Sequence, residues 1–121
     1  MTTEEKKAFL LLNSVIFHYH GLDEDEKRIL EEMADQIKGH DELAWAMDFI
    51  SSDYLTAFAR ARDYLNSVIG RMDKSARLDY LDKVWKANNH KGYITEMEAT
   101  AMLRLAKDWR VENELIALIR S

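Results

Sequence analysis

The sequence predicts an all-α fold of about seven helices, and three observations support this prediction. The 121 residues include no proline and only four glycines, so few residues interrupt a helix. Strong helix formers are abundant, namely alanine, leucine, glutamate, lysine, arginine and methionine. Apolar residues recur at helical spacing along the chain, and no convincing strand, hairpin or glycine-rich phosphate loop is found. At this length we expect one domain over residues 1–121.

The first three helices are predicted from apolar residues in the N-terminal half. One face of the first helix, which runs to about residue 19, carries Phe9, Leu12 and Ile16. The second helix has the stripe of a core-facing helix, formed by Ile29, Leu30, Met33, Ala34 and Ile37. The third is shorter and is expected over residues 42–50, with Leu43, Ala46, Met47 and Ile50 directed inward.

Four more helices are predicted in the rest of the chain. The fourth covers residues 54–69 and carries an apolar set of Leu55, Phe58, Ala59, Leu65 and Ile69. The fifth covers residues 75–88, and the polar run 88–92 after it, with two asparagines and a glycine, is typical of a helix end. The last two are expected over residues 95–109 and 112–119.

Two helix starts are marked by the same four-residue pattern. Asp23 stands three residues before Glu26, and Thr95 stands three residues before Glu98. In such a capping box the first side chain bonds the backbone of the third helical residue, whose own side chain bonds back. We therefore interpret both glutamates first as capping residues, placed where the positive end of the helix dipole favours an acid.

The two patterns are 72 positions apart, and the match extends beyond them. Residues 18–47 align with residues 90–119 without gaps, and six of these thirty pairs are identical. Apolar positions agree as well, for example Leu22 with Ile94 and Met33 with Leu105. We interpret this as an internal pseudo-repeat with halves at about 5–52 and 73–121, joined by a helix over 54–70. Two such halves can bury their apolar faces against each other.

Residues 20–26 (His-Gly-Leu-Asp-Glu-Asp-Glu) and 91–98 (Lys-Gly-Tyr-Ile-Thr-Glu-Met-Glu) resemble the glycine turns of the tellurite-resistance TerB-like family. The resemblance implies an all-helical domain, used alone or beside other modules in bacterial stress-response and membrane-associated complexes. It also implies that catalysis is not the chief role, and that acids in the turns are candidates for binding a divalent metal. The family usually has aspartate before the glycine, where this chain has His20 and Lys91, so only Glu26 and Glu98 carry over directly.

The residues themselves also suggest a metal site near the first turn. Imidazole and carboxylate ligands suit zinc, nickel or manganese, and they are clustered at His18, His20, Asp23 and Glu26, with counterparts at His90, Glu96 and Glu98. On a helix, residues 18 and 20 point about 200° apart, which works against a shared ion. The competing interpretation, which we favour, is a solvated acidic turn that stabilises the next helix. No cofactor other than a divalent metal ion is suggested.

Charge and composition restrict the kinds of partner. Seventeen basic and twenty-two acidic residues give a net charge of −5, so nucleic-acid binding is not expected. No segment approaches the ~20 apolar residues of a membrane helix, the first residues do not resemble a signal peptide, and cysteine is absent. We expect no membrane insertion and a cytoplasmic location.

The leading functional hypothesis is a non-enzymatic interaction or scaffold module that binds a protein partner. No nucleophile elbow, metalloprotease motif or phosphate loop points to an enzyme. Candidate contact residues are Glu24 and Asp25 in the acidic turn, and Trp45. An exposed Trp45 would be a good anchor for a partner, although a tryptophan is more commonly found partly buried at the margin of the core. Two alternatives stay open: a divalent-metal-binding domain, and a small acidic inhibitor or immunity-type protein that blocks a basic partner. The oligomeric state is left open.

Overall fold

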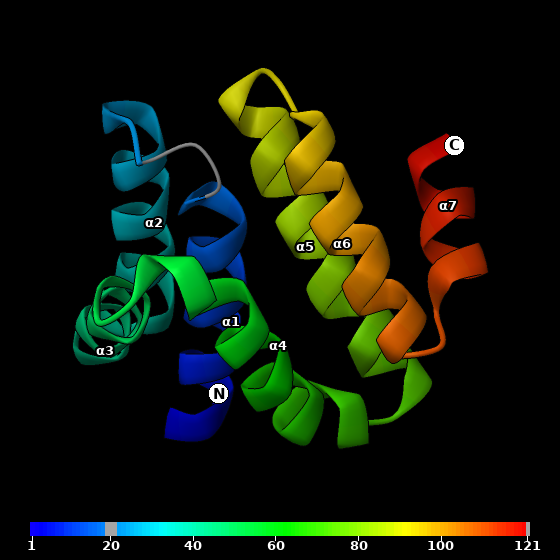
Figure 1. Cartoon of the computed structure of the whole chain (residues 1–121), viewed down its shortest axis with the longest axis horizontal. Coiled ribbons are helices and arrows are strands. Elements are labelled where there is room, and N and C mark those ends of the chain that lie inside the picture. Colours follow the sequence, from blue (N-terminus) through cyan, green and yellow to red (C-terminus); the bar gives the residue numbers. More distant parts are fainter. Residues whose placement is uncertain (19–21, 121) are drawn as a thin grey trace.

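The computed structural model describes residues 1–18 and 22–120, and within these ranges the chain is all-α, as predicted (Figure 1). These residues form seven α-helices and no strand. The helices are α1 (Thr3–Phe17), α2 (Glu24–Ile37), α3 (His40–Ser51), α4 (Ala57–Val68), α5 (Lys74–Lys91), α6 (Glu96–Asp108) and α7 (Glu112–Arg120). Two short 3-10 helices, η2 (Tyr54–Thr56) and η3 (Ile69–Arg71), flank α4. No helix of the described residues is long and apolar enough to cross a bilayer.

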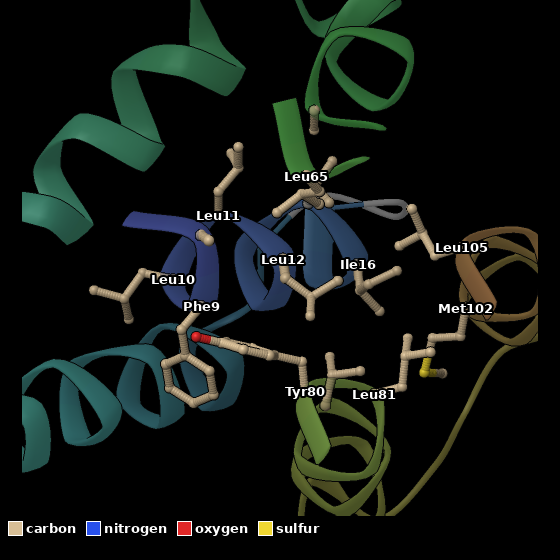
Figure 2. Close-up of a cluster of buried hydrophobic side chains, with 14 of the residues drawn as sticks. Phe9, Leu10, Leu11, Leu12, Ile16, Leu65, Tyr80, Leu81, Met102 and Leu105 are labelled. Atoms are coloured by element: carbon tan, nitrogen blue, oxygen red, sulfur yellow. The ribbon is translucent and has the colours of Figure 1, made fainter. Parts of the chain in front are cut away.

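Helix α1 lies at the centre of the fold and is buried on every side from Ala8 onward, while Thr3 and Glu4 at its start are exposed. All ten residues from Ala8 to Phe17 are buried. Helices α2 and α3 lie on one side of α1, and α5 and α6 lie on the other (Figure 1). Figure 2 shows side chains of α1 meeting Leu65 of α4, Leu81 of α5 and Leu105 of α6. The sequence predicted one apolar face, but the part of α1 that its neighbours enclose, residues 8–17, is buried all round, including the polar Asn13 and Ser14.

Two helix ends differ from the sequence-based expectation. The fourth helix was expected from residue 54, but the chain first forms η2, because the Asp53 side chain accepts a hydrogen bond from the Leu55 N–H at 3.1 Å. Leu55 therefore lies outside α4 and points into solvent, instead of joining its apolar face. The fifth helix continues three residues beyond the expected end at Asn88. It stops at Gly92, whose φ of 99° is a left-handed conformation that glycine adopts without strain.

The local geometry recurs at the separation of 72 residues. Both predicted capping boxes are confirmed, at the starts of α2 and α6. The described non-glycine residues with positive φ are Lys38 at 55° and Arg110 at 60°, which occupy corresponding positions at the ends of these helices. Shallow grooves beside α2 and α6 are also lined at corresponding positions, such as Leu43 and Leu115. A pseudo-repeat would produce this pattern, and the repeat itself stays a prediction.

A second set of contacts joins α4, α5 and the end of α6. The indole N–H of Trp109, which is buried, donates to Asn66 Oδ1 at 2.7 Å, and the backbone oxygen of Trp109 accepts from Arg77 at 2.6 Å. Arg62 donates two hydrogen bonds to the carboxylate of Asp108, at 2.6 and 2.7 Å. These contacts fix the C-terminal end of α6 against α4.

The Arg62–Asp108 pair should make the stability of the protein sensitive to acid. Hydrogen bonds from Arg62 hold the pKa of Asp108 below its ordinary value of 3.8, against a smaller opposing effect of burial. The pair therefore stabilises the fold at pH values above 3.8, and this contribution is lost as the pH falls through the lowered folded-state pKa. We expect the Asp108→Asn substitution to lower the free energy of unfolding at neutral pH, with a difference from wild type that shrinks in acid.

Urea unfolding at neutral pH and at about pH 3, below the ordinary carboxyl pKa, measures this difference. Asp48→Asn, at an exposed position of α3, is the matched control and should change the free energy of unfolding little at either pH. An Asp108→Asn protein that lost stability in acid as steeply as wild type would contradict the prediction.

Candidate functional site

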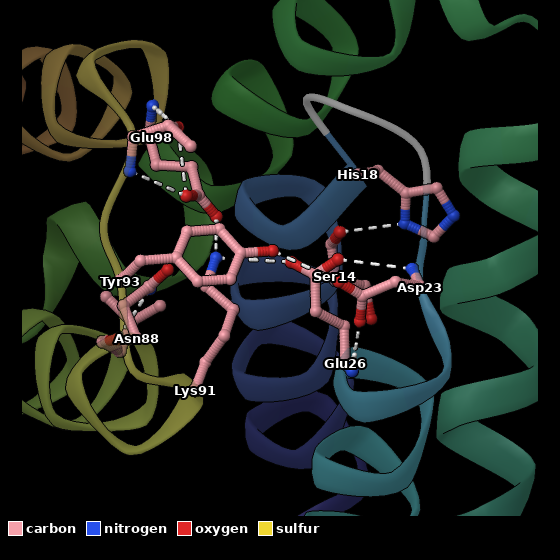
Figure 3. A network of polar contacts seen from close by, with 10 residues as sticks. Ser14, His18, Asp23, Glu26, Asn88, Lys91, Tyr93 and Glu98 are labelled. Atoms are coloured by element: carbon pink, nitrogen blue, oxygen red, sulfur yellow. Dashed lines mark hydrogen bonds and ion pairs between the residues drawn. The ribbon is translucent and has the colours of Figure 1, made fainter.

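Three helix ends meet beside α1, and a buried lysine lies between two buried glutamates there (Figure 3). Lys91 is the last residue of α5, Glu26 is in the first turn of α2, and Glu98 is in the first turn of α6. The side chain of Lys91 is 1% exposed, and those of Glu26 and Glu98 are 3% and 0% exposed. We call these three residues the buried triad.

Each carboxylate of the buried triad divides its two oxygens between a helix cap and the lysine. Glu26 Oε1 accepts from the Asp23 N–H at 3.2 Å, while Glu26 Oε2 lies 3.2 Å from Lys91 Nζ. Glu98 Oε1 accepts from the Thr95 N–H at 3.0 Å, while Glu98 Oε2 accepts from Lys91 Nζ. The capping boxes therefore place both carboxylates, and their remaining oxygens face one ammonium group.

Aromatic rings surround the ammonium group of Lys91. Its Nζ lies 5.1 Å from the ring centroid of Phe17 and 4.6 Å from that of Tyr93. Positions over a ring face are favourable for a cation, because the face carries negative charge density. The buried triad contains two acidic side chains and one basic side chain, so a single cation is shared by two carboxyl groups.

A hydrogen bond nearer the surface links two of the helix starts beside the buried triad. The Tyr93 hydroxyl donates to Asp23 Oδ2 at 3.0 Å, and so links the turn before α6 to the residue that caps α2. This bond, with burial and the nearby Glu26, Asp23 and Glu98 charges as smaller causes, raises the pKa of Tyr93 to about 12. The pKa of Asp23 is lowered, first by the hydrogen bond from the Glu26 N–H and then, against burial, by Tyr93 and Lys91.

The histidines predicted for a metal site are not part of this arrangement. His18 Nδ1 donates to the Ser14 carbonyl oxygen at 2.9 Å, and its ring stacks against Tyr54. His90 and Glu96 are exposed, and His20 lies outside the described residues. Within residues 1–18 and 22–120 no group of three or more histidine, cysteine, aspartate or glutamate side chains could hold a metal ion. Of the predicted metal ligands, the structure thus brings together Glu26, Glu98 and Asp23. The ammonium group of Lys91 occupies the position between the two glutamates where a shared metal ion would have to lie.

The residues predicted to contact a partner are already engaged within the fold. Glu24 pairs with Lys27 at 3.4 Å and Asp25 with Arg28 at 3.2 Å, both on the exposed surface of α2. Trp45 is half-buried, and its ring centroid lies 5.4 Å from that of Phe49 and 5.2 Å from that of Tyr64. It lies at the margin of the core, in an aromatic cluster that joins α3 to α4.

Exposed apolar residues gather instead on η2, a feature that the sequence analysis did not single out. Leu55 is 98% exposed and Tyr54 is 65% exposed. Beside them is a shallow groove of about 250 Å³, lined by Val15, His18, Ile50, Tyr54, Ala57 and Phe58. Asp53, whose side chain turns the chain at η2, was the one local signal of an interrupted helix.

Comparisons of this chain with protein-family models, with curated proteins and with solved structures find no match. The resemblance to the TerB-like family therefore stays a prediction that depends on the two glycine turns.

Proposed function

We propose that this chain is a non-enzymatic protein-binding module that docks a partner on η2 and the groove beside it. The observation that carries the proposal is the exposure of Tyr54 and Leu55 on one turn. Burying a leucine side chain is worth about 1.5–3 kcal/mol, so covering Leu55 would contribute substantially to the affinity for a partner. An apolar side chain of the partner would enter the groove lined by Val15, Ile50 and Phe58.

The turn that presents these residues is held rigidly. Arg60 donates to the backbone oxygens of Phe49 and Asp53, each at 2.8 Å, and to the Thr56 hydroxyl at 2.9 Å. Asp53 in turn accepts from the Leu55 N–H. A surface already fixed in its binding conformation loses less entropy when a partner binds.

The acidic turn is a weaker candidate for the contact surface. Glu24 and Asp25 were the expected contacts, but both are paired with neighbouring cations, and exposed ion pairs of this kind contribute little energy. The resemblance to the TerB-like family agrees with a non-enzymatic module, and it suggests bacterial stress-response assemblies as the setting in which to look for the partner.

Replacing Leu55 with serine should weaken capture of the partner without affecting the fold. Tagged wild-type and Leu55→Ser proteins are used to capture proteins from an extract of the cells that make this chain, and bound proteins are compared by quantitative mass spectrometry. The retained partner is then purified and titrated against both proteins, with an expected loss of affinity of at least about tenfold, or 1.4 kcal/mol.

Leu118→Ser, at an exposed leucine of α7, is the matched control and should bind like wild type. Circular dichroism of all three proteins checks that the helices are intact. A purified partner that bound Leu55→Ser as tightly as wild type would refute η2 as the docking turn.

A further inference from the structure

The outer face of α6 has apolar side chains between two exposed charges of opposite sign. Met97 is 50% exposed and Leu103 is 37% exposed, with Thr100 exposed between them. Glu96 and Arg104 are exposed on the same helix, and neither forms an ion pair or hydrogen bond within the described part of the chain. In Figure 1 this helix lies at the front of the molecule and is visible along its whole length.

These two charges differ from those of the neighbouring helix. On α5 exposed charges pair at a spacing of four residues, as Lys83 does with Asp79 at 3.0 Å and Lys86 does with Asp82 at 2.8 Å. Glu96 and Arg104 are eight residues apart, or about 12 Å along the helix, and so cannot pair with each other. Arg104 also attracts Asp108 one turn further along α6, but the Asp108 carboxylate accepts hydrogen bonds from Arg62. The hydrogen-bonding groups of Glu96 and Arg104 are therefore available to charges outside this chain.

The pattern on α6 is symmetric about Thr100. At 100° per residue, Glu96 and Arg104 lie about 40° to either side of Thr100, and Met97 and Leu103 lie about 60° to either side. A two-fold axis through Thr100 would therefore bring Glu96 of one copy to Arg104 of the second copy, and the reverse. Apolar side chains would meet between the two ion pairs, which is the self-complementary arrangement of a two-fold interface.

A hollow next to this face gives the second copy a place to dock. It has a volume of about 310 Å³, lies between α4 and α6, and is lined by Phe58, Glu96, Met97, Thr100, Ala101 and Arg104. Phe58, Met97 and Ala101 give the hollow an apolar lining that an aliphatic side chain can contact, and Glu96 and Arg104 line it as well. We propose that two copies of this chain associate through α6, crossing at Thr100, with Glu96 of each copy paired to Arg104 of the other.

Charge reversal with sedimentation velocity over a range of concentrations tests this arrangement. Wild type should dimerise as its concentration rises. Glu96→Arg and Arg104→Glu should each raise the dimer dissociation constant by about tenfold or more, because each places like charges together twice per dimer. The double variant Glu96→Arg/Arg104→Glu should dimerise like wild type, and so should an equimolar mixture of the two single variants.

Two controls make the result specific. Lys83→Glu reverses an exposed charge on α5 and should leave the dissociation constant unchanged. Leu55→Ser should also dimerise like wild type. Dimerisation through α6 and partner binding at η2 are therefore tested by different variants, and either proposal can fail without the other. A wild-type protein that stays monomeric up to millimolar concentration overturns the proposal, and so does a dimer that the double variant does not restore.

Discussion

Replacing Lys91 with methionine should lower the free energy of unfolding by about 4 kcal/mol, the typical cost of removing one partner from a buried ion pair. The reason is the geometry of the buried triad. Methionine fills a similar volume but leaves the carboxylates of Glu26 and Glu98 facing each other without a cation. We expect the melting temperature to fall by roughly 15 °C in a domain of this size. Urea unfolding followed by circular dichroism measures the change.

The matched control is Lys86→Met on the same helix. Lys86 is largely exposed and pairs with Asp82, so its loss should cost no more than about 0.5 kcal/mol. The triple variant Glu26→Gln/Lys91→Met/Glu98→Gln should recover most of the stability that Lys91→Met loses, because glutamine keeps the capping bonds and no charge remains unpaired. Equal stability of the Lys91→Met and Lys86→Met proteins would contradict the role given to the triad.

Replacing Trp109 with alanine should cost about as much, about 3–5 kcal/mol, through the cavity that it leaves. The indole is buried against Gly70, with its Cδ1 3.6 Å from the position that a Cβ on this glycine would occupy, and it donates to Asn66. Trp109→Phe keeps most of the apolar contact and loses the hydrogen bond, so it should be intermediate. Thermal unfolding of both variants separates packing from hydrogen bonding.

Trp85→Ala is the reference for this series, because Trp85 is only half-buried at the edge of the core. Its removal should destabilise the protein clearly less than removal of Trp109. If the two alanine variants melted together, Trp109 would not have the central packing role that its burial indicates.

Local signals in the sequence were sufficient to predict the helices and two of their starts. The capping boxes at Asp23 and Thr95 depend on residues three apart, so their geometry is decided within one turn and both are confirmed. The absence of proline and the apolar spacing are likewise local features, and they predicted the seven helices. Two helix ends were predicted less well, because the apolar pattern does not show what decides them. The hydrogen bond to the Asp53 side chain delays the start of α4, and the left-handed backbone of Gly92 sets the end of α5.

The site could not be predicted because it depends on contacts between distant residues. Glu26 and Lys91 are 65 positions apart and meet only once α1 has brought α2 and α5 to its two sides. A basic residue at the end of a helix is usually exposed, so Lys91 was interpreted as part of a helix end. One signal was present: Lys91 stands before Gly92, where the family that the turns resemble has an acid. A cation seven positions before the capping Glu98 is consistent with pairing to that glutamate, but nothing local connects it to Glu26.

The long separation between Glu26 and Lys91 has a consequence for synthesis of the chain on the ribosome. At about 5–20 residues per second, Lys91 is added roughly 3–13 s after Glu26. Through this interval the carboxylate of Glu26 has no internal cation to accompany it out of water, which makes its burial unfavourable. We therefore expect the first three helices to emerge as an open assembly, with the core closing when the end of α5 arrives. A nascent chain stopped before residue 91 should be the form that chaperones and proteases recognise.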